Sequence, residues 1–451
     1  RDTRSSASHP IPLHAPVNPD PTMLHTLKNR DYRYLWLGQS VSHLGDQFHL
    51  VALPWLVLAI TGDPLQLGLV LAVAGLPRAV LMLVGGAVAD RISPRLLMLG
   101  ADLVRLVITV LIVIAVAADQ VQLWMVYALA IAFGTISGFF LPAAEATLPR
   151  VLREEDLAGG NSLMMIADQV AQFFGPALAG TVIALMAHGQ AGQGGTMTGI
   201  AVAFGVDALT FAVGAVTLWR MRPLAGFGSA HHPLHDVAEG LRFVWRHGSI
   251  RIMVIIIALA NFLLTGPLLV GLPVLASARL GEGAAAFGMI LSGYALGNLI
   301  GMGIAGSTRP STRVIRWVGV GIFPLLGIVY STVALSGSTW VSVLVMVIGG
   351  VANGYLAITV ITMLQRMAPR HLVGRVMALL MLSMYGLAPV SQVVAGAILQ
   401  LSVTWLFLGA AIGLLVPGVL ALRHRTMWDL TPVTGSEPIQ DGEAGRVAVA
   451  G

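Results

Sequence analysis

Residues 86–118 read GAVADRISPRLLMLGADLVRLVITVLIVIAVAA. A short turn with acidic and basic residues leads into an apolar run over 96–118 that only Asp102 and Arg105 interrupt. About 20 apolar residues in a helix cross the roughly 30 Å hydrocarbon core of a bilayer. The stretch therefore predicts a charged turn at a membrane surface followed by a transmembrane helix.

The composition extends this prediction to the whole chain. Of 451 residues, 56% are hydrophobic and only 10% are charged, and the mean hydropathy is +0.82. Soluble domains carry about 25% charged residues. The composition indicates a membrane protein and excludes a cytosolic enzyme. It also excludes a nucleic-acid-binding protein, because the arginines behind the net charge of +5 lie mostly between apolar runs.

Motifs of enzymes and cofactor sites are missing from the sequence. It contains no HExxH, no P-loop and no GxSxG, and without cysteine it has no thiolate metal site. A cluster of His231, His232, His235 and Asp236 has metal-binding residue types, but its polar surroundings favour a solvated loop. We expect no enzymatic activity, no cofactor and no metal.

Eleven further apolar runs obey the same length rule and give twelve predicted spans, with eleven or thirteen as the alternative counts. The predicted spans cover 35–60, 65–89, 96–118, 122–148, 158–187, 198–219, 250–278, 284–306, 314–336, 340–364, 372–400 and 403–422.

The basic residues predict the orientation of these spans. If the N-terminus is cytoplasmic, Arg279 is the only basic residue in an outer loop, and Arg78 and Arg105 lie inside spans. All other arginines and Lys28 then lie on the inner side, which is the bias of cytoplasmic loops. We expect both termini in the cytoplasm.

A long polar connection divides the spans into two groups of six. The expected organisation is a disordered cytoplasmic tail (1–34), a six-helix half (35–219), a central cytoplasmic loop (220–249), a second six-helix half (250–422) and a cytoplasmic tail (423–451). The halves also repeat weakly, since Leu53-Pro54 and Leu272-Pro273 occupy corresponding positions. Many secondary transporters are built from such repeats, with the substrate path between them.

Two motifs carry a family resemblance. Gly86, Asp90, Arg91 and Arg95 follow the second span with the spacing of the loop 2–3 signature of the major facilitator superfamily, although serine and proline stand where glycine and arginine are common. Gly175, Pro176 and Gly180 resemble the glycine-proline signature of the antiporters in this superfamily, and they would also suit close helix packing.

The resemblance extends over about residues 28–422 and is strongest to bacterial exporters that include macrolide-efflux and enterobactin-export proteins. It implies an all-α integral membrane protein of a bacterial inner membrane, with twelve transmembrane helices in two six-helix pseudo-repeat halves. It also implies that the loop 2–3 motif acts in gating, with Glu145 as its partner. The chain departs from many drug:proton antiporters in that its fourth span lacks an arginine-bearing motif, so proton antiport does not carry over.

Ionisable side chains inside the spans are candidate functional groups because their burial is costly. Asp46 lies in the middle of the first span, on one helix face with Gln39, His43 and His49. It is expected to contact substrate or protons, or alternatively to pair with Arg78.

Asp168 shares a face of the fifth span with Gln172, and it either lines a cavity or makes an interhelical hydrogen bond. Asp102 and Arg105 have the spacing of a structural pair, and Asp207 is expected to be a packing contact.

The C-terminal half offers neutral polar groups instead. Asn261, Asn298, Tyr355 and Thr359 are expected to line a path through it. A methionine stripe at Met377, Met381 and Met384 suits either an adaptable pocket or ordinary packing.

Together these features predict a monomeric secondary exporter of amphipathic small molecules, of the drug, macrolide or siderophore type, that works by alternating access and is coupled to protons. One alternative is a transporter of lysophospholipid or another lipid, possibly uncoupled. The other is a membrane sensor or scaffold that transports nothing.

Overall fold

The computed structural model of the chain describes residues 23–189, 193–223, 242, 245–308, 312–367 and 373–424. Within them, twelve helices or helix groups are long and apolar enough to cross a membrane. The predicted twelve-span, all-helical architecture is thereby confirmed.

Six helices form the N-terminal half: α1 (Arg30–Thr61), α2 (Pro64–Arg91), α3 (Pro94–Ala117), α4 (Leu123–Val151), α5 (Leu157–Gly189) and α6 (Gln193–Arg220). The C-terminal half contains α8 (Gly248–Gly266), the π-helix η3 (Pro267–Gly271), α9 (Leu272–Arg279), α10 (Ala284–Ser307), α11 (Thr312–Leu335), α12 (Thr339–Met367), α13 (Val373–Tyr385), α14 (Ala388–Leu399), α15 (Val403–Gly413) and α16 (Leu415–Arg423). Short 3₁₀ helices, η1 (Met23–Lys28) and η2 (Glu154–Asp156), precede α1 and α5.

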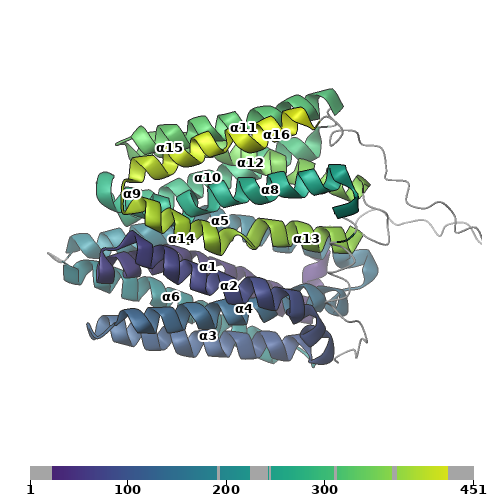
Figure 1. Ribbon diagram of the computed structural model, residues 1–451. Helices are drawn as coiled ribbons and strands as arrows, with labels where there is room; N and C mark the ends of the chain where they lie inside the picture. The colour runs from purple at the N-terminus through teal and green to yellow at the C-terminus, as the bar shows by residue number, and fades with distance from the viewer. Residues whose placement is uncertain are drawn as a thin grey trace, which may run out of the picture.

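The two halves lie side by side with their helices roughly parallel to one axis (Figure 1). Successive spans alternate in direction, so η1 and the end of α16 lie at the same end of the molecule, here called the tail end. The opposite end, here called the far end, carries the turns after α1, α3, α9 and α14. The observed helices begin and end within a few residues of the predicted spans.

Part of the expected N-terminal tail (1–34) is helical. Residues 23–28 form η1, and α1 begins at Arg30 because the side chain of Asn29 accepts hydrogen bonds from the backbone N–H groups of Asp31 and Tyr32. An N-cap of this kind satisfies backbone donors that have no partner within the helix. The sequence of residues 23–34 did not reveal where the helix begins, because residues that cap a helix are polar, as are the residues of an unstructured segment. Residues 1–22, most of the central loop with its four-residue histidine–aspartate cluster, and residues 425–451 lie outside the described residues.

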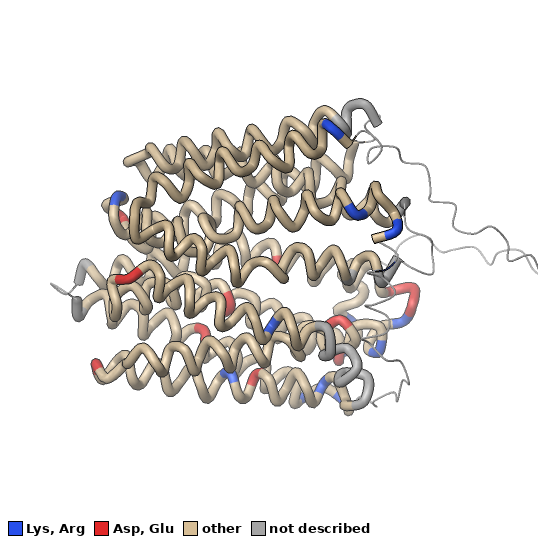
Figure 2. Tube along the Cα trace, in the orientation of Figure 1, with Lys and Arg blue, Asp and Glu red and all other residues tan. Residues whose placement is uncertain are grey.

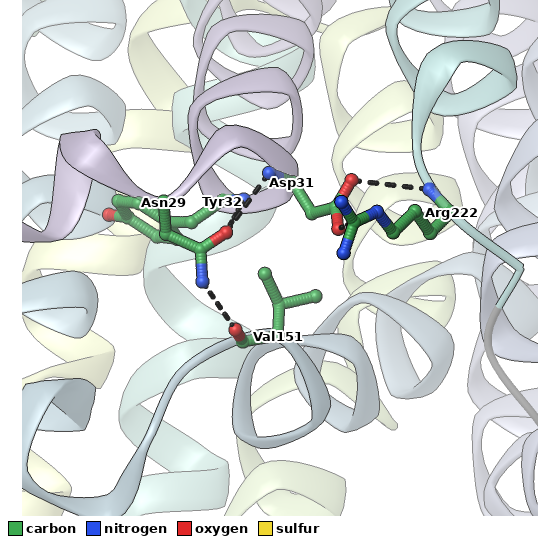
Figure 3. Close-up of polar contacts among 5 residues, drawn as sticks. All are labelled: Asn29, Asp31, Tyr32, Val151 and Arg222. Atoms are coloured by element: carbon green, nitrogen blue, oxygen red, sulfur yellow. Dashed lines mark hydrogen bonds and ion pairs between the residues drawn. The ribbon is translucent and has the colours of Figure 1, made fainter.

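The start of α1 is tied to two other helix ends at the tail end (Figure 3). The Asn29 side chain donates a 2.8 Å hydrogen bond to the carbonyl of Val151, the last residue of α4. The carboxylate of Asp31 accepts a hydrogen bond from the backbone N–H of Arg222, just after α6. These contacts join α1, α4 and α6 into one unit.

Several spans are interrupted near their middle. The seventh span passes from α8 into η3 at Pro267, whose ring removes a backbone donor, and the eleventh breaks between Tyr385 and Ala388. Ser391 of α14 accepts a hydrogen bond from the N–H of Gly266 and donates one to the carbonyl of Phe262. The two interruptions therefore lie against each other and satisfy part of their own backbone.

The described contacts between the halves lie from the middle of the molecule to the far end. The α5 helix packs on α10, and α2 packs on α14. At the first crossing the backbone N–H of Ala177 donates a 3.0 Å hydrogen bond to Ser292, and Trp55 of α1 stacks on Phe287 of α10. At the second, Gly68 of α2 lies against the backbone of Gln392. The far end is closed in this conformation.

Candidate functional site

Two carboxylates of the N-terminal half approach each other in the middle of the spans. Asp168 of α5 accepts a 2.6 Å hydrogen bond from Gln172, and one of its oxygens lies 3.7 Å from Nδ1 of His43 on α1. The side chains of His43 and Asp168 are 36% and 37% exposed. A polar group at this depth is tolerated where it faces a cavity, and the partial exposure of these two side chains agrees with such a position.

Asp46 lies one helical turn after His43 and is half-buried. Its carboxylate is close enough to interact electrostatically with Asp168, Asp102 and Asp207. We call His43, Asp46, Asp168 and Gln172 the acidic cluster. It brings together two acids that the sequence placed on different helices, and it contains both of the predicted proton carriers.

The predicted polar face of α1 divides between two neighbours. At 100° per residue, His43 and His49 lie about 120° apart around α1. The two ends of this polar face therefore contact different helices. His49 turns away from the acidic cluster and lies 3.2 Å from the carboxylate of the fully buried Asp207 on α6. Its ring stacks on Phe133. Gln39 is also buried, and its Nε2 has no hydrogen-bond partner.

Asp207 is therefore not only a packing contact, since it forms an interhelical pair with His49. Asp102 and Arg105 also differ from the expected pair. Neither carboxylate oxygen of Asp102 has a hydrogen-bond partner, although its charge is near that of Arg105. Arg105 donates to Ser137 and lies over three phenylalanine rings, the nearest being Phe140 at 4.6 Å.

Arg78 does not form the expected ion pair with Asp46. Its guanidinium lies 5.6 Å from the ring centroid of Tyr385, which belongs to the other half. No ion pair of Arg78 occurs among the described residues.

The C-terminal half contains an apolar cavity of about 160 Å³. Its wall is formed by α8, α10, α11, α12 and α13, with mainly aliphatic side chains and methionines and a few polar groups. The polar lining residues are Asn261, Thr265, Tyr294 and Asn353. Figure 2 shows that acidic residues are absent from the middle of this half, and Glu282 is its only described acid.

The predicted polar path agrees with this cavity in part. Asn261 lines it, and so does Met384 of the methionine stripe. Asn298 lies behind the wall and accepts a hydrogen bond from Asn353. Tyr355 and Thr359 are not in the lining, and the hydroxyl of Thr359 donates to the carbonyl of Tyr355 within α12.

The helix-five motif forms a crossing point of three helices. A Cβ at Gly175 would overlap Gln47 of α1, and one at Gly180 would overlap the carbonyl oxygen of Ala284 on α10. The carbonyl of Pro176 in turn lies against Gly288 of α10. Small residues thus allow α5 to contact α1 within its own half and α10 across the closed far end.

In the loop 2–3 motif, Arg95 has a role that the sequence did not reveal. It is buried and donates 2.7 Å hydrogen bonds to the carbonyls of Leu218 and Trp219, in the last turn of α6. A cation at this position donates hydrogen bonds to carbonyl groups that have no partner within the helix. The surroundings of Gly86, Asp90 and Arg91 lie outside what the structure describes. Glu145 lies near the tail end of α4 and is exposed.

We expect Arg95→Ala to destabilise the folded protein by about 2 kcal/mol, because two hydrogen bonds from a buried charged group are lost. Thermal unfolding of the purified protein measures this effect. Arg95→Lys is the matched variant, and we expect it to recover part of the loss through one hydrogen bond. Equal stability of the wild type and Arg95→Ala would show that the α6 end needs no cap.

Twelve membrane-spanning helices in two six-helix halves that pack together at the far end define a multi-pass membrane transporter rather than an enzyme. A family model described as "Transmembrane secretion effector" matches residues 22–439. The chain belongs to this family of the major facilitator superfamily, as the sequence motifs predicted.

Relatives of known name are transporters of the same type. The chain is 26% identical to the multidrug efflux pump Tap of Mycolicibacterium fortuitum over 392 residues, which cover 84% of this chain and 91% of that protein. Identity to Tap of Mycobacterium tuberculosis is 27% over 403 residues, covering 86% and 91%. The uncharacterized MFS-type transporter YfiS of Bacillus subtilis is 30% identical over 219 residues, which cover 47% of this chain and 48% of YfiS.

Solved structures share the fold at low sequence identity. The nucleoside transporter NupG superposes with a TM-score of 0.67 at 12% identity, over 88% of this chain and 99% of NupG. The POT family transporter PepTSo gives 0.67 at 14% identity, over 88% and 98%.

Proposed function

We propose that the protein is a proton-driven exporter of amphipathic small molecules in a bacterial inner membrane. Its two halves rock about a central site, which opens alternately toward the tail end and the far end. The observation that carries this proposal is the pairing of an acidic cluster in one half with an apolar cavity in the other. An acid beside an apolar surface suits cationic or neutral lipophilic molecules.

The closed far end supports the alternating-access part of the proposal. With the tail end in the cytoplasm, as the arginine distribution favours, this conformation would receive cargo from the cytoplasm. Gly86, Asp90 and Arg91 are proposed to latch the tail end, with Glu145 opposite them, when the molecule opens outward. Asp46 and Asp168 are the proposed proton carriers, and one chain is the proposed working unit.

The efflux pump relatives favour drug-like cargo over the two rival functions. A lipid transporter would move a lysophospholipid and need no pH gradient. A sensor or scaffold would move nothing and would leave the acidic cluster without a role. Transport of fluorescent lipophilic dyes and of a fluorescent lysophospholipid into vesicles, each with and without a pH gradient, separates these three functions.

The cavity of the C-terminal half gives a further prediction. Its volume of about 160 Å³ is below the roughly 300–1,000 Å³ of typical ligand sites, so cargo must use the adjoining space between the halves as well. We expect Ala357→Trp, which fills the cavity, to raise the KM for bulky dyes about tenfold, a loss of about 1.4 kcal/mol in binding.

Ala397→Trp serves as the matched control, because Ala397 of α14 is exposed on the outside of the same half. Its KM should stay near the wild-type value. An unchanged KM in Ala357→Trp, with the variant correctly folded, would show that cargo does not enter the cavity.

A further inference from the structure

Arg78 occupies an unusual position for an arginine. It lies 14 residues after Pro64 at the start of the 28-residue helix α2, which is about 21 Å along the helix at 1.5 Å per residue. This places the guanidinium at mid-depth of the span, where arginine is rare and marks a functional site by default.

The guanidinium is directed toward the C-terminal half, since it lies over the ring of Tyr385. Leu76 and Val80 on α2 are 60% and 54% exposed. Each lies two residues from Arg78 and so about 160° around the helix from it. Arg78 is exposed as well, on the opposite side of α2 from these two apolar residues.

Tyr385 belongs to the other half and contacts Arg78 next to the crossing of α2 and α14. Toward the far end, Gly75 of α2 packs against Pro389 of α14. Tyr385 is the last residue of α13, just before the break in the eleventh span, and it is 44% exposed. The Arg78–Tyr385 contact therefore lies on the tail-end side of this crossing.

A tyrosine ring attracts the guanidinium but supplies no anionic oxygens. The ring offers a π face, whereas the five N–H donors of arginine match the paired oxygens of a carboxylate or phosphate. No described acid forms an ion pair with Arg78. Arg78 is exposed, so its donors are accessible to a partner with anionic oxygens.

We propose that Arg78, with Tyr385 beside it, is a binding site for the anionic group of an amphipathic molecule, a phosphate or carboxylate carried on an apolar tail. The central space then has a cationic pole on α2 in addition to the acidic cluster on α1 and α5. Such a site accepts the anionic end of zwitterionic cargo or the headgroup of a membrane lipid. The inference concerns binding and does not depend on the direction or driving force of transport.

Binding to the purified full-length protein in neutral detergent tests the proposal. The probes are dodecyl phosphate and dodecyltrimethylammonium, followed by intrinsic tryptophan fluorescence. We expect Arg78→Gln to weaken binding of dodecyl phosphate about tenfold or more, and Arg78→Lys to weaken it less, because lysine keeps the charge but loses the bidentate geometry. Binding of the ammonium probe should be unchanged in both variants.

Arg30→Gln is the matched control. Arg30 is exposed and lies 5.5 Å from the ring centroid of Tyr34, but this contact stays within the N-terminal half at the tail end. Dodecyl phosphate should bind this variant as it binds the wild type. Equal losses in Arg30→Gln and Arg78→Gln would indicate general surface attraction and overturn the proposal, as would unchanged phosphate binding in Arg78→Gln. A loss of phosphate and ammonium binding together would also overturn it, because Arg78 would then serve to position the acidic cluster.

Two further readouts identify the source of the anionic group. Mass spectrometry of phospholipid that copurifies with the wild type, but not with Arg78→Gln, would identify a lipid headgroup. Counterflow of dodecyl phosphate into neutral phosphatidylcholine vesicles would identify cargo. Either result supports the site. If Arg78→Gln fails to fold, the comparison of Arg78→Lys with the wild type decides, since equal phosphate affinity in the two would contradict bidentate recognition.

Discussion

Replacing both Asp46 and Asp168 by asparagine should reduce gradient-driven dye transport about tenfold or more. A tenfold reduction in rate corresponds to about 1.4 kcal/mol. Asparagine keeps the shape and hydrogen-bonding capacity of the side chain and removes only the carboxylate that takes up and releases a proton. Both carboxylates belong to the acidic cluster, where their charges interact. Each single variant keeps one carboxylate that can bind a proton, so it should retain more activity than the double variant.

Transport in vesicles with an imposed pH gradient measures this effect. Asp119→Asn is the matched control, because Asp119 lies in the turn after α3 at the far end, away from the acidic cluster. The control should transport normally. Unchanged gradient-driven transport in a folded double variant would refute proton coupling through these two acids.

Gly288→Val should abolish transport, because it prevents the far end from closing. Any Cβ at Gly288 of α10 would overlap the carbonyl oxygen of Pro176 on α5, and a backbone atom has little freedom to move away. Without closure at this crossing, the halves would remain apart at the far end. The expected loss is at least as large as that of the double aspartate variant, since every transport cycle passes through the closed state.

Gly303→Val on the same helix is the matched control, since nothing lies within 4 Å of a Cβ built there. A cysteine introduced at Ser292, at the same crossing, reports the state of the far end in the otherwise cysteine-free chain. It should react faster with a membrane-impermeant thiol reagent in Gly288→Val than in Gly303→Val. Equal labelling and full transport in Gly288→Val would contradict the role of this crossing.

The sequence sufficed to predict the spans because their signal is local. An apolar run of sufficient length forms a helix in a bilayer whatever its neighbours are, so the predicted runs and the observed helices agree. The glycines of the helix-five motif also signalled close packing correctly. Which helix each of them contacts was not readable, because that depends on how the two halves dock.

Side-chain partners were predictable only where they lie on the same helix. The hydrogen bond between Asp168 and Gln172 follows from their spacing of four residues. The pair of His49 and Asp207 joins residues 158 positions apart, and helical periodicity gives the face of each residue without naming the helix opposite. The same limit hid the role of Arg95, whose acceptors are backbone carbonyls and leave no trace in side-chain patterns.

Dye accumulation in a bacterial host without its own major pumps tests the central claim most directly. Cells that express the wild type should accumulate less of the lipophilic dyes and macrolides than cells that express the Asp46→Asn, Asp168→Asn double variant. A protonophore should raise accumulation in the wild type to the level of the variant. Equal accumulation with and without well-folded wild-type protein, across the whole panel, would contradict the proposal that this chain is a proton-driven exporter of amphipathic molecules.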